Sequence, residues 1–247
     1  MKDTPLTLCL TKGFSLVEMA MVLAIITLLL GGLLPTLSTK MESQHINETR
    51  KQLDEIQQAL IGFAIINGRL PCPAYSTGEE DPVGGGVCNH PYDGVVPAAT
   101  LGLQTTDNNG FAVDSWGIRI RYAVTSWSKT TSPLFSNVFT TSNGISTVGI
   151  SNLSPNLLVC SSSIASGFSG SGCGANNALT SSPGVPVVIY STGKNGGVGG
   201  AGLDEQANTD GNRVFVSHTP TPDFDDLVVW LSPNILYNRM VMAGKLP

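Results

Sequence analysis

The three histidines of the chain are the first side chains to consider for catalysis, because histidine is the most common general acid or base in enzymes. They are His45, His90 and His218. Acyl-transfer chemistry requires a histidine beside a nucleophile and an acid, and the sequence around these three shows no such grouping. We therefore expect a protein that is not an enzyme and has no catalytic residues.

The cysteines offer either metal ligands or disulfides. Cys72 together with Cys88 and His90 contains the ligand types of a zinc site, but two cysteines outside the cytoplasm more often pair with each other. Pairing by proximity predicts the disulfides Cys72–Cys88 and Cys160–Cys173, each closing a loop of about 15 residues. Four cysteines allow three connectivities, so the sequence alone leaves the pairing open.

A glycine-rich segment matches a nucleotide-binding pattern on paper. Residues 197–202 read Gly-Val-Gly-Gly-Ala-Gly, which fits G-x-G-x-x-G. A dinucleotide loop needs a helix directly after it, so that the third glycine packs closely and the helix amino end meets the pyrophosphate. Residues 203–208 are polar and few, so we interpret the segment as a flexible loop and predict no nucleotide cofactor.

Glu18 is the one charged residue in a long apolar stretch, residues 14–35. As a helix, residues 14–34 would be about 31 Å long, enough to cross a bilayer core of about 30 Å. A charge at the centre of such a helix costs about 2.5–3.5 kcal/mol, so Glu18 should have a partner. We expect a transmembrane helix here, and Lys2 and Lys12 before it favour a cytoplasmic amino terminus.

Residues 12–18, Lys-Gly-Phe-Ser-Leu-Val-Glu, resemble the processing site of type IV prepilins and of the pseudopilins of type II secretion. The resemblance implies that prepilin peptidase cuts after Gly13 and methylates the new terminal amine of Phe14. It further implies that Glu18 pairs with the terminal amine of a neighbouring subunit. An ordinary signal peptide has a shorter apolar core followed by a small-residue cleavage site, and a simple anchor would not explain Glu18.

The same resemblance divides the chain and makes Pro35 a helix-loosening residue of the assembly helix. Residues 1–13 would be a leader peptide, which removes Cys9 from the mature protein. Charged residues make up only 13% of the chain and the net charge is −5. The sequence therefore lacks the excess of positive charge that would indicate nucleic-acid binding. Abundant Gly, Ser, Thr and Asn are typical of a loop-rich domain outside the cytoplasm.

After the transmembrane and assembly helix at residues 14–35, the pattern predicts an amphipathic helix over residues 36–68. Its apolar side chains recur at spacings of three and four residues: Leu53, Ile56, Leu60 and Phe63. The helix should end at Asn67-Gly68, where glycine can adopt the left-handed conformation. Gly31, Gly32 and Pro35 predict a kink or a local loss of helix, because proline lacks a backbone donor.

Residues 69–247 should form a loop-rich β head with a carboxyl-terminal helix. Strands are expected at 118–124, 185–190, 213–217 and 227–231, and the last helix at 233–243. We interpret residues 74–110 as a loop and residues 125–182 as a Ser/Thr-rich insertion. The insertion has short strands at 135–139 or 157–159, and the sequence does not determine its topology. The predicted fold class is α+β and pilin-like, with the long helix packed on a mainly antiparallel sheet.

Two further stretches resemble the major pseudopilin of type II secretion. Residues 114–117, Asp-Ser-Trp-Gly, are similar to its D-x-W-G motif, and the loop around residues 190–202 with the segment 225–230 is similar to its calcium-binding loop. Carried over by position, the ligands would be Asn195 and Asp226, with calcium as the bound ion. The chain departs from the family because Asn195 replaces an aspartate.

Lys194 also adds a positive charge beside that loop. Asp204 and Asp210 could compensate for both departures.

The function implied is a structural subunit of a type IV pilus or pilus-like filament, a minor one. The alternative is a pseudopilin of a type II secretion system, and a less favoured one is an anchored periplasmic binding protein or enzyme. Partners would be other pilin or pseudopilin subunits, prepilin peptidase, an inner-membrane assembly platform and membrane lipid, with no nucleic acid. We expect a single pass through the inner membrane with a periplasmic head, followed by transfer into the filament.

Overall fold

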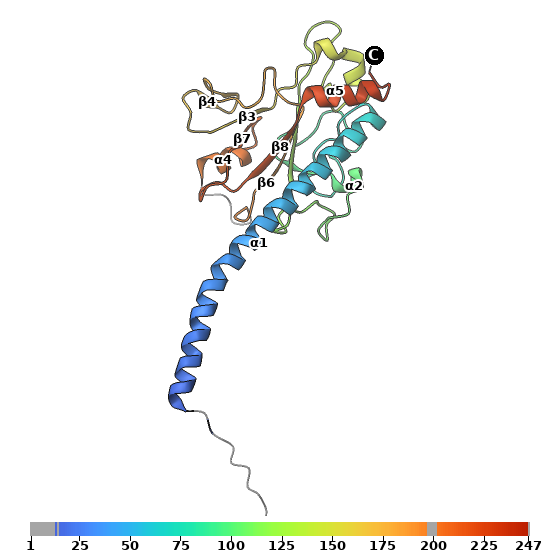
Figure 1. Ribbon diagram of the computed structural model, residues 1–247. Coiled ribbons are helices and arrows are strands. Elements are labelled where there is room, and N and C mark those ends of the chain that lie inside the picture. The colour runs from blue at the N-terminus through green and yellow to red at the C-terminus, as the bar shows by residue number, and fades with distance from the viewer. Residues whose placement is uncertain (1–12, 14, 197–201, 247) are drawn as a thin grey trace, which may run out of the picture. The chain divides into compact units, whose positions relative to one another are not determined.

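The computed structural model describes residue 13, residues 15–196 and residues 202–246, and of residues 30–38 the backbone alone. Contacts divide the chain into an N-terminal unit, Met1–Gln44, and a C-terminal unit, His45–Pro247. The predicted α+β class is confirmed: the chain combines helices with strands that pair mainly antiparallel (Figure 1).

Helix α1, Leu16–Asn67, contributes residues to both units. It ends where the sequence predicts, because Gly68 adopts a φ of +67° and its N–H bonds to the carbonyl of Ala64 at 2.9 Å. The sequence predicts a kink or a local loss of helix at Pro35; the helical backbone continues through this residue, so the second alternative is wrong. Proline removes a single backbone donor, and the bonds of the flanking turns hold the helix together.

The predicted transmembrane span needs correction. Among the residues that the structure describes, no helix combines the length and the apolar character needed to cross a membrane. The structure therefore does not support the predicted single-pass inner-membrane location with a periplasmic head.

The main sheet has four strands in the order β1-β2-β6-β8, and all neighbours are antiparallel. The strands are β1 (Gly94–Val95), β2 (Arg121–Val124), β6 (Val187–Ser191) and β8 (Leu227–Leu231). Every residue of β6 is buried, so both faces of the sheet are covered at this strand. Successive side chains of a strand point to opposite faces, and β6 therefore feeds two separate apolar clusters.

Helix α1 covers one face of the sheet with the predicted apolar stripe. Leu53, Ile56 and Leu60 are buried against Val187 and Ile189. Burying one such leucine or isoleucine contributes about 1.5–3 kcal/mol to folding. The stripe thus accounts for how the C-terminal unit holds the second half of the helix.

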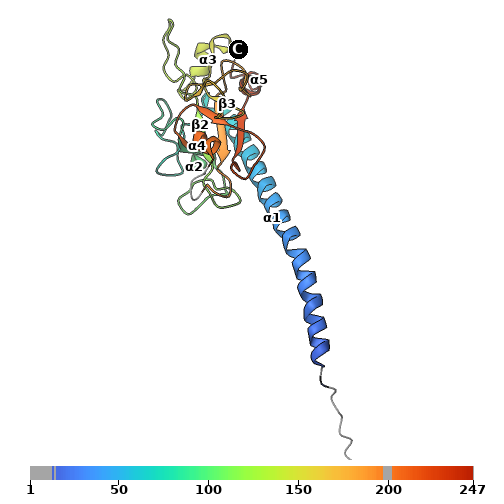
Figure 2. The same cartoon turned by 90° about the vertical axis from the view of Figure 1, so that its left-hand side faces the viewer.

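The opposite face of the sheet is covered by a pair of strands, β3 (Leu158–Cys160) and β7 (Val214–Val216), which run parallel. Val159 and Phe215 pack there against Val188 and Tyr190. In Figure 1 and Figure 2 this pair and α1 lie on opposite sides of the main sheet. The C-terminal unit is therefore layered as helix, sheet and strand pair.

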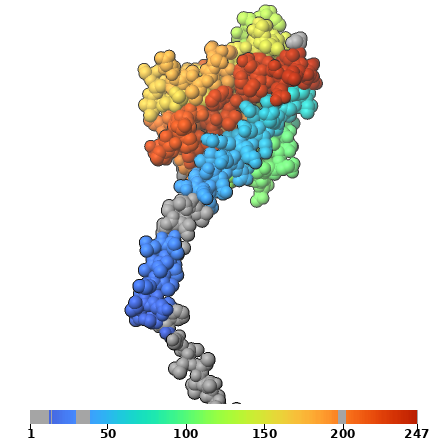
Figure 3. All heavy atoms as spheres, in the orientation of Figure 1, coloured from blue at the N-terminus to red at the C-terminus, as the bar shows by residue number. Residues whose placement is uncertain are grey.

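The predicted last helix is present as α5, and its surface borders that of α1 in Figure 3. The predicted strands at 185–190, 213–217 and 227–231 are also present, with small shifts at their ends. The remaining elements are short and connect these layers: α2 (Ala98–Leu101), α3 (Gly144–Val148), η1 (Ile150–Asn152), β4 (Phe168–Ser169), β5 (Gly172–Cys173), α4 (Leu203–Thr209) and α5 (Pro233–Met242).

Both predicted disulfides are confirmed. Cys72 bonds to Cys88 across 16 residues, and Cys160 bonds to Cys173 across 13 residues. Each closes a short loop, which removes conformational freedom from the unfolded chain. Because all four sulfurs are used in this way, the alternative of a zinc site on Cys72 and Cys88 is wrong.

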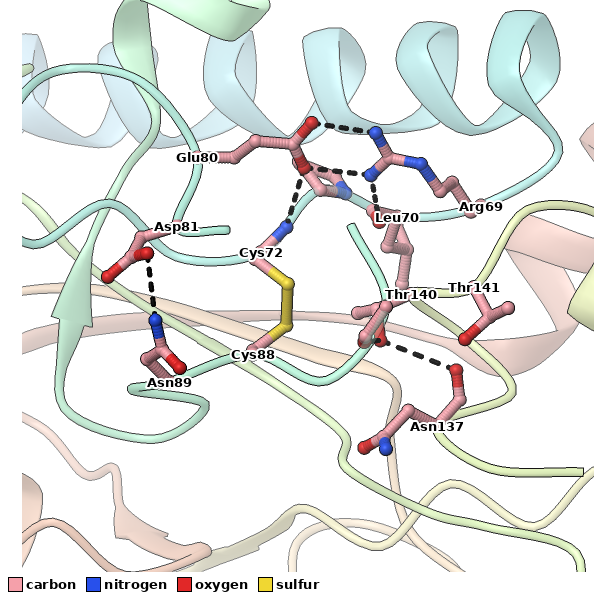
Figure 4. The surroundings of a disulfide bond; sticks show 12 residues. Arg69, Leu70, Cys72, Glu80, Asp81, Cys88, Asn89, Asn137, Thr140 and Thr141 are labelled. Carbon is pink, nitrogen blue, oxygen red and sulfur yellow. Dashed lines mark hydrogen bonds and ion pairs between the residues drawn. A yellow bond between two sulfur atoms is a disulfide. The ribbon is translucent and has the colours of Figure 1, made fainter. Parts of the chain in front are cut away.

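A buried ion pair holds the first of these loops next to the end of α1 (Figure 4). The guanidinium of Arg69 donates two hydrogen bonds to the carboxylate of Glu80, at 2.6 and 2.8 Å. The same carboxylate accepts the N–H groups of Cys72 and Gly84, both at 3.1 Å. The Arg69 and Glu80 side chains are only 7% and 5% exposed, so the pair is desolvated and its charges depend on each other.

We predict that Arg69→Met lowers the free energy of unfolding by about 3–5 kcal/mol, because Glu80 is then left as a buried charge without its counter-ion. Urea denaturation of the non-reduced protein measures this change. The matched control is Arg119→Met, since Arg119 forms an exposed pair with Asp107 at 3.0 Å and should cost far less. Equal losses in the two variants would contradict the role given to the buried pair.

Candidate functional site

The antiparallel pairing of β6 and β8 brings two polar segments to one edge of the sheet. Ser191 at the end of β6 lies opposite Leu227 at the start of β8. The chain that leaves β6 and the chain that enters β8 therefore meet, which places Asn195 beside Asp225 and Asp226. The predicted ligands Asn195 and Asp226 are thus brought together.

Helix α4 completes this edge with Glu205, which is 2% exposed. Carboxylate oxygens of Glu205, Asp225 and Asp226 lie within 4.8 Å of one another. Oε1 of Glu205 accepts the amide Nδ2 of Asn195 and the backbone N–H of Asp225, both at 3.0 Å. Oδ2 of Asp226 accepts Nδ2 of Asn208 at 2.6 Å. We call Asn195, Glu205, Asp225 and Asp226 the acidic cluster.

Two oxygens of the acidic cluster are buried without a hydrogen-bond partner among the described residues: Oδ1 of Asn195 and Oδ1 of Asp225. A buried acceptor without a donor is costly, and a cation satisfies it. Three carboxylates and one amide oxygen are the hard ligands that Ca²⁺ prefers. The residues present therefore fit the predicted calcium ion, with Glu205 and Asp225 added to Asn195 and Asp226.

The electrostatics of the acidic cluster also favour a bound cation. Burial raises the pKa of Asp226 to about 7, despite the hydrogen bond from Asn208, and the nearby carboxylates of Glu205 and Asp225 raise it further. Burial also raises the pKa of Asp225. Burial and the neighbouring carboxylates thus disfavour the ionisation of Asp225 and Asp226, and a positive charge among them would oppose this effect.

The other two predicted ligands, Asp204 and Asp210, do not join the acidic cluster. Oδ2 of Asp210 accepts Nδ2 of Asn212, and the residue is exposed. Asp204 bonds to the N–H and hydroxyl of Ser163, both at 2.5 Å, and lies 3.1 Å from Nε2 of His218. Burial alone would raise the pKa of Asp204, but the hydrogen bonds from Ser163 and His218 lower it.

The group Ser163, Asp204 and His218 contains the residue types of an acyl-transfer triad in the wrong order. In such a triad the histidine lies between the serine and the acid and takes the proton of the hydroxyl. Here the carboxylate of Asp204 lies between the other two, and the ring of His218 stacks on Phe224 with centroids 3.9 Å apart. The arrangement joins two loops and supplies no base for Ser163.

The sequence interpretation missed Glu205 and Asp225, and it misread the segment after the glycine run. A seven-residue helix, α4, does begin directly after Gly202, so the expectation of loop was wrong there; residues 197–201 lie outside the described residues. Its first turn carries Asp204 and Glu205, and two acids at a helix amino end repel a phosphate. The available signal for Asp225 was its place beside Asp226, just before a strand.

The D-x-W-G stretch forms a turn that ties the sheet to α1. Oδ1 of Asp114 accepts the N–H groups of Trp116 and Ile118 at 2.9 Å, and its Oδ2 accepts the hydroxyl of Ser191 at 2.5 Å. Ser115 donates to the carbonyl of His45 at 2.8 Å. This turn also explains why the predicted strand 118–124 is shorter than expected, since β2 begins only at Arg121.

The predicted processing and assembly residues lie in the N-terminal unit. Gly13 is exposed, whereas Phe14 and the side chain of Pro35 lie outside what the structure describes. Glu18 is exposed, and its Oε2 lies 3.5 Å from the backbone N–H of Ser15, one residue before α1 begins. This is the geometry of a capping box, in which an acid three residues into a helix reaches back to its start.

Comparison of the chain with family models, with curated proteins and with solved structures finds no match.

We predict that Asp226→Asn stabilises the protein at neutral pH when a chelator removes divalent ions. With a pKa of about 7 when folded and 3.8 as the usual value, the folded state keeps a proton that the unfolded state releases between these pH values. The wild type therefore loses stability as pH rises from about 4 to 7, at about 1.4 kcal/mol per pKa unit. The gain in Asp226→Asn should be about 2–4 kcal/mol at pH 8 and vanish near pH 4.

Unfolding midpoints measured across this pH range test that prediction. Asp107 is a control of opposite sign, because the N–H of Phe111 holds its pKa below the usual value. Asp107→Asn should lose stability at neutral pH. A pH-independent difference between wild type and Asp226→Asn would contradict the proposed cause.

Proposed function

We propose that this protein is a structural subunit, a minor one, of a type IV pilus or pilus-like filament. Its fold supports this reading, because the second half of α1 packs on an antiparallel sheet as expected for a pilin-like subunit. In this reading prepilin peptidase cuts between Gly13 and Phe14 and methylates Phe14, and an assembly platform adds the processed subunit to the filament. The role is structural and not catalytic.

The observation that carries the proposal is the surface of α1 in the N-terminal unit. Its large apolar side chains are exposed: Leu16, Val17, Met19, Met21, Val22, Leu23, Ile25, Ile26, Leu28 and Leu29. Apolar surface of this extent is unfavourable in water, at about 25 cal/mol per Å². Bundling the helices of neighbouring copies would bury it, and that burial is the proposed driving force for assembly.

Glu18 would set the register of that bundle. Inside a bundle of apolar helices a carboxylate without a counter-ion is strongly disfavoured. The terminal amine of Phe14 in a neighbouring copy would supply the counter-ion, and it can do so in one axial position. The capping contact with Ser15 is a second possible role for the same carboxylate, so the experiment must separate charge from capping.

We predict that Glu18→Val and Glu18→Gln both reduce assembly, whereas cleavage after Gly13 persists. Glutamine can still serve a capping box at this position, but it carries no charge for the Phe14 amine. Loss of one charged hydrogen bond of about 1.5–3 kcal/mol should lower the ratio of assembled to unassembled subunit about tenfold or more. Quantifying both fractions in cells that form the filament, with terminal mass spectrometry, measures ratio and cleavage together.

The possible outcomes separate the two roles. If Glu18→Gln assembles like the wild type and Glu18→Val does not, Glu18 acts as a helix cap and the register mechanism is wrong. If both variants assemble normally, Glu18 has no part in assembly. A wild-type chain that still begins at Met1 would contradict the processing step.

A second candidate, a pseudopilin of type II secretion, is favoured by the acidic cluster and the D-x-W-G turn. For this reading we propose that the acidic cluster binds calcium, through Asn195, Glu205, Asp225 and Asp226. A bound calcium ion would place a positive charge among these three carboxylates, of which Glu205 and Asp226 are buried and Asp225 is half-buried. Identifying genes for secretion components or for pilus retraction motors beside this gene would distinguish the two candidates.

We predict that calcium raises the thermal midpoint of the wild type. A ligand that binds only the folded state adds about 2.7 kcal/mol of stability at a hundredfold excess over its Kd, or about 5–10 °C for a protein of this size. Asp225→Asn should lose most of this shift, and Asp210→Asn, whose carboxyl lies outside the acidic cluster, should keep it. Differential scanning calorimetry with and without calcium measures the shift in thermal midpoint. The absence of a shift in the wild type would contradict the proposed calcium site.

A further inference from the structure

A cavity of about 450 Å³ on the C-terminal unit lies beside β2 and is lined by charged groups of both signs. Its buried end is formed by Glu205 and Asp226, which are 2% and 3% exposed. Its open end is formed by Tyr75 from the loop after α1, Asp93 just before β1, and Arg121 from β2. A cavity of this size and mixed lining is typical of a site for a small ligand.

At the open end the ring of Tyr75 is held in place by stacking and is still exposed to solvent. Tyr75 is 55% exposed, although its ring stacks on the ring of His90 with centroids 3.7 Å apart and planes 5° from parallel. His90 is in turn fixed by Asp93, whose carboxylate lies 3.3 Å from Nδ1 of His90. An immobilised ring with exposed surface on a cavity wall is a ready platform for a second ring, and it loses little entropy on binding.

Next to this platform lie hydrogen-bonding groups that can both donate and accept. Arg121 donates to the backbone carbonyl of Asp93 at 2.9 Å, and no carboxylate among the described residues forms an ion pair with it. Its guanidinium has five N–H donors in total, which leaves some for a ligand. Asp93 offers carboxylate acceptors, and the hydroxyl of Thr192 on the same cavity can donate or accept. The hydroxyl of Thr209 already donates to the backbone carbonyls of Glu205 and Gln206 and can accept.

We propose that this cavity binds a neutral saccharide of one or two rings, with one ring face stacked on Tyr75. Sugar hydroxyls both donate and accept hydrogen bonds, so they match a wall that presents Arg121 next to Asp93. The apolar C–H face of a sugar ring matches the flat face of Tyr75. An anionic ligand is disfavoured because the carboxylate of Asp93 lies at the open end of the cavity, where the ligand would bind. This proposal is independent of whether the protein forms a filament.

The test is a titration of the full chain, in calcium-containing buffer, with glucose, galactose, N-acetylglucosamine, lactose and maltose. Binding is followed by the chemical shifts of isotope-labelled tyrosine and arginine side chains. For ligands of this size we expect a Kd of about 1 mM for the best sugar. Glycine and phenylalanine, titrated in the same way, test the competing possibility of a zwitterionic ligand.

Variants at the open end decide whether the sugar binds where we propose. Tyr75→Ala should raise the Kd about tenfold or more, because the stacking surface is lost, whereas Tyr75→Phe keeps the ring and should bind like the wild type. Tyr75 is largely exposed, so both variants should fold, and an unchanged thermal midpoint checks this. No binding of any of the five sugars, unchanged binding in Tyr75→Ala, or binding of the amino acids alone would each overturn the proposal.

Discussion

The fold of the C-terminal unit depends on the burial of β6 on both faces. A strand of which every residue is buried needs one layer above it and another below it. The first half of this requirement is met by the apolar stripe of α1, and the second by the β3–β7 pair. The same strand fixes the acidic cluster, because its antiparallel partner β8 begins where β6 ends. Core packing and candidate site therefore share one element.

The C-terminal unit buries charge in two contrasting ways. Glu80 is paired with Arg69 and receives two backbone donors besides, so its charge is compensated within the chain. Glu205, Asp225 and Asp226 bring like charges together, and Oδ1 of Asp225 and Oδ1 of the adjacent Asn195 have no donor among the described residues. The charges of the first arrangement are compensated within the chain, whereas the second keeps like charges close together. This contrast, more than the count of acids, distinguishes the structural clasp from the candidate site.

Features that depend on local chemistry were predictable from the sequence. The end of α1 at Asn67, the last helix, the strand at 227–231 and both disulfides follow from glycine chemistry, capping, periodicity and proximity. Features that depend on distant partners were not. The parallel pairing of β3 with β7 joins segments separated by β6, and no periodicity encodes a partner.

The candidate site shows the same division. Asn195 and Asp226 could be named from a resemblance, but Glu205 reaches the acidic cluster only because α4 folds directly after Gly202. Seven residues rich in polar side chains give no clear helical pattern, so neither the helix nor its carboxylate was visible. The predicted membrane span was wrong in another way, because no helix among the described residues combines the length and the apolar character that a span needs.

The order of strands has a consequence for how the chain reaches this structure. β2 must find β6, and β3 must find β7, across long intervening segments. Contacts between distant segments are formed only after the entropy of closing large loops has been lost, which makes folding slow compared with that of helical domains. While this search lasts, α1 has no sheet to cover its stripe. The time that a newly made chain spends with apolar surface uncovered is thus set by the topology of the sheet and not by the stability of the helix.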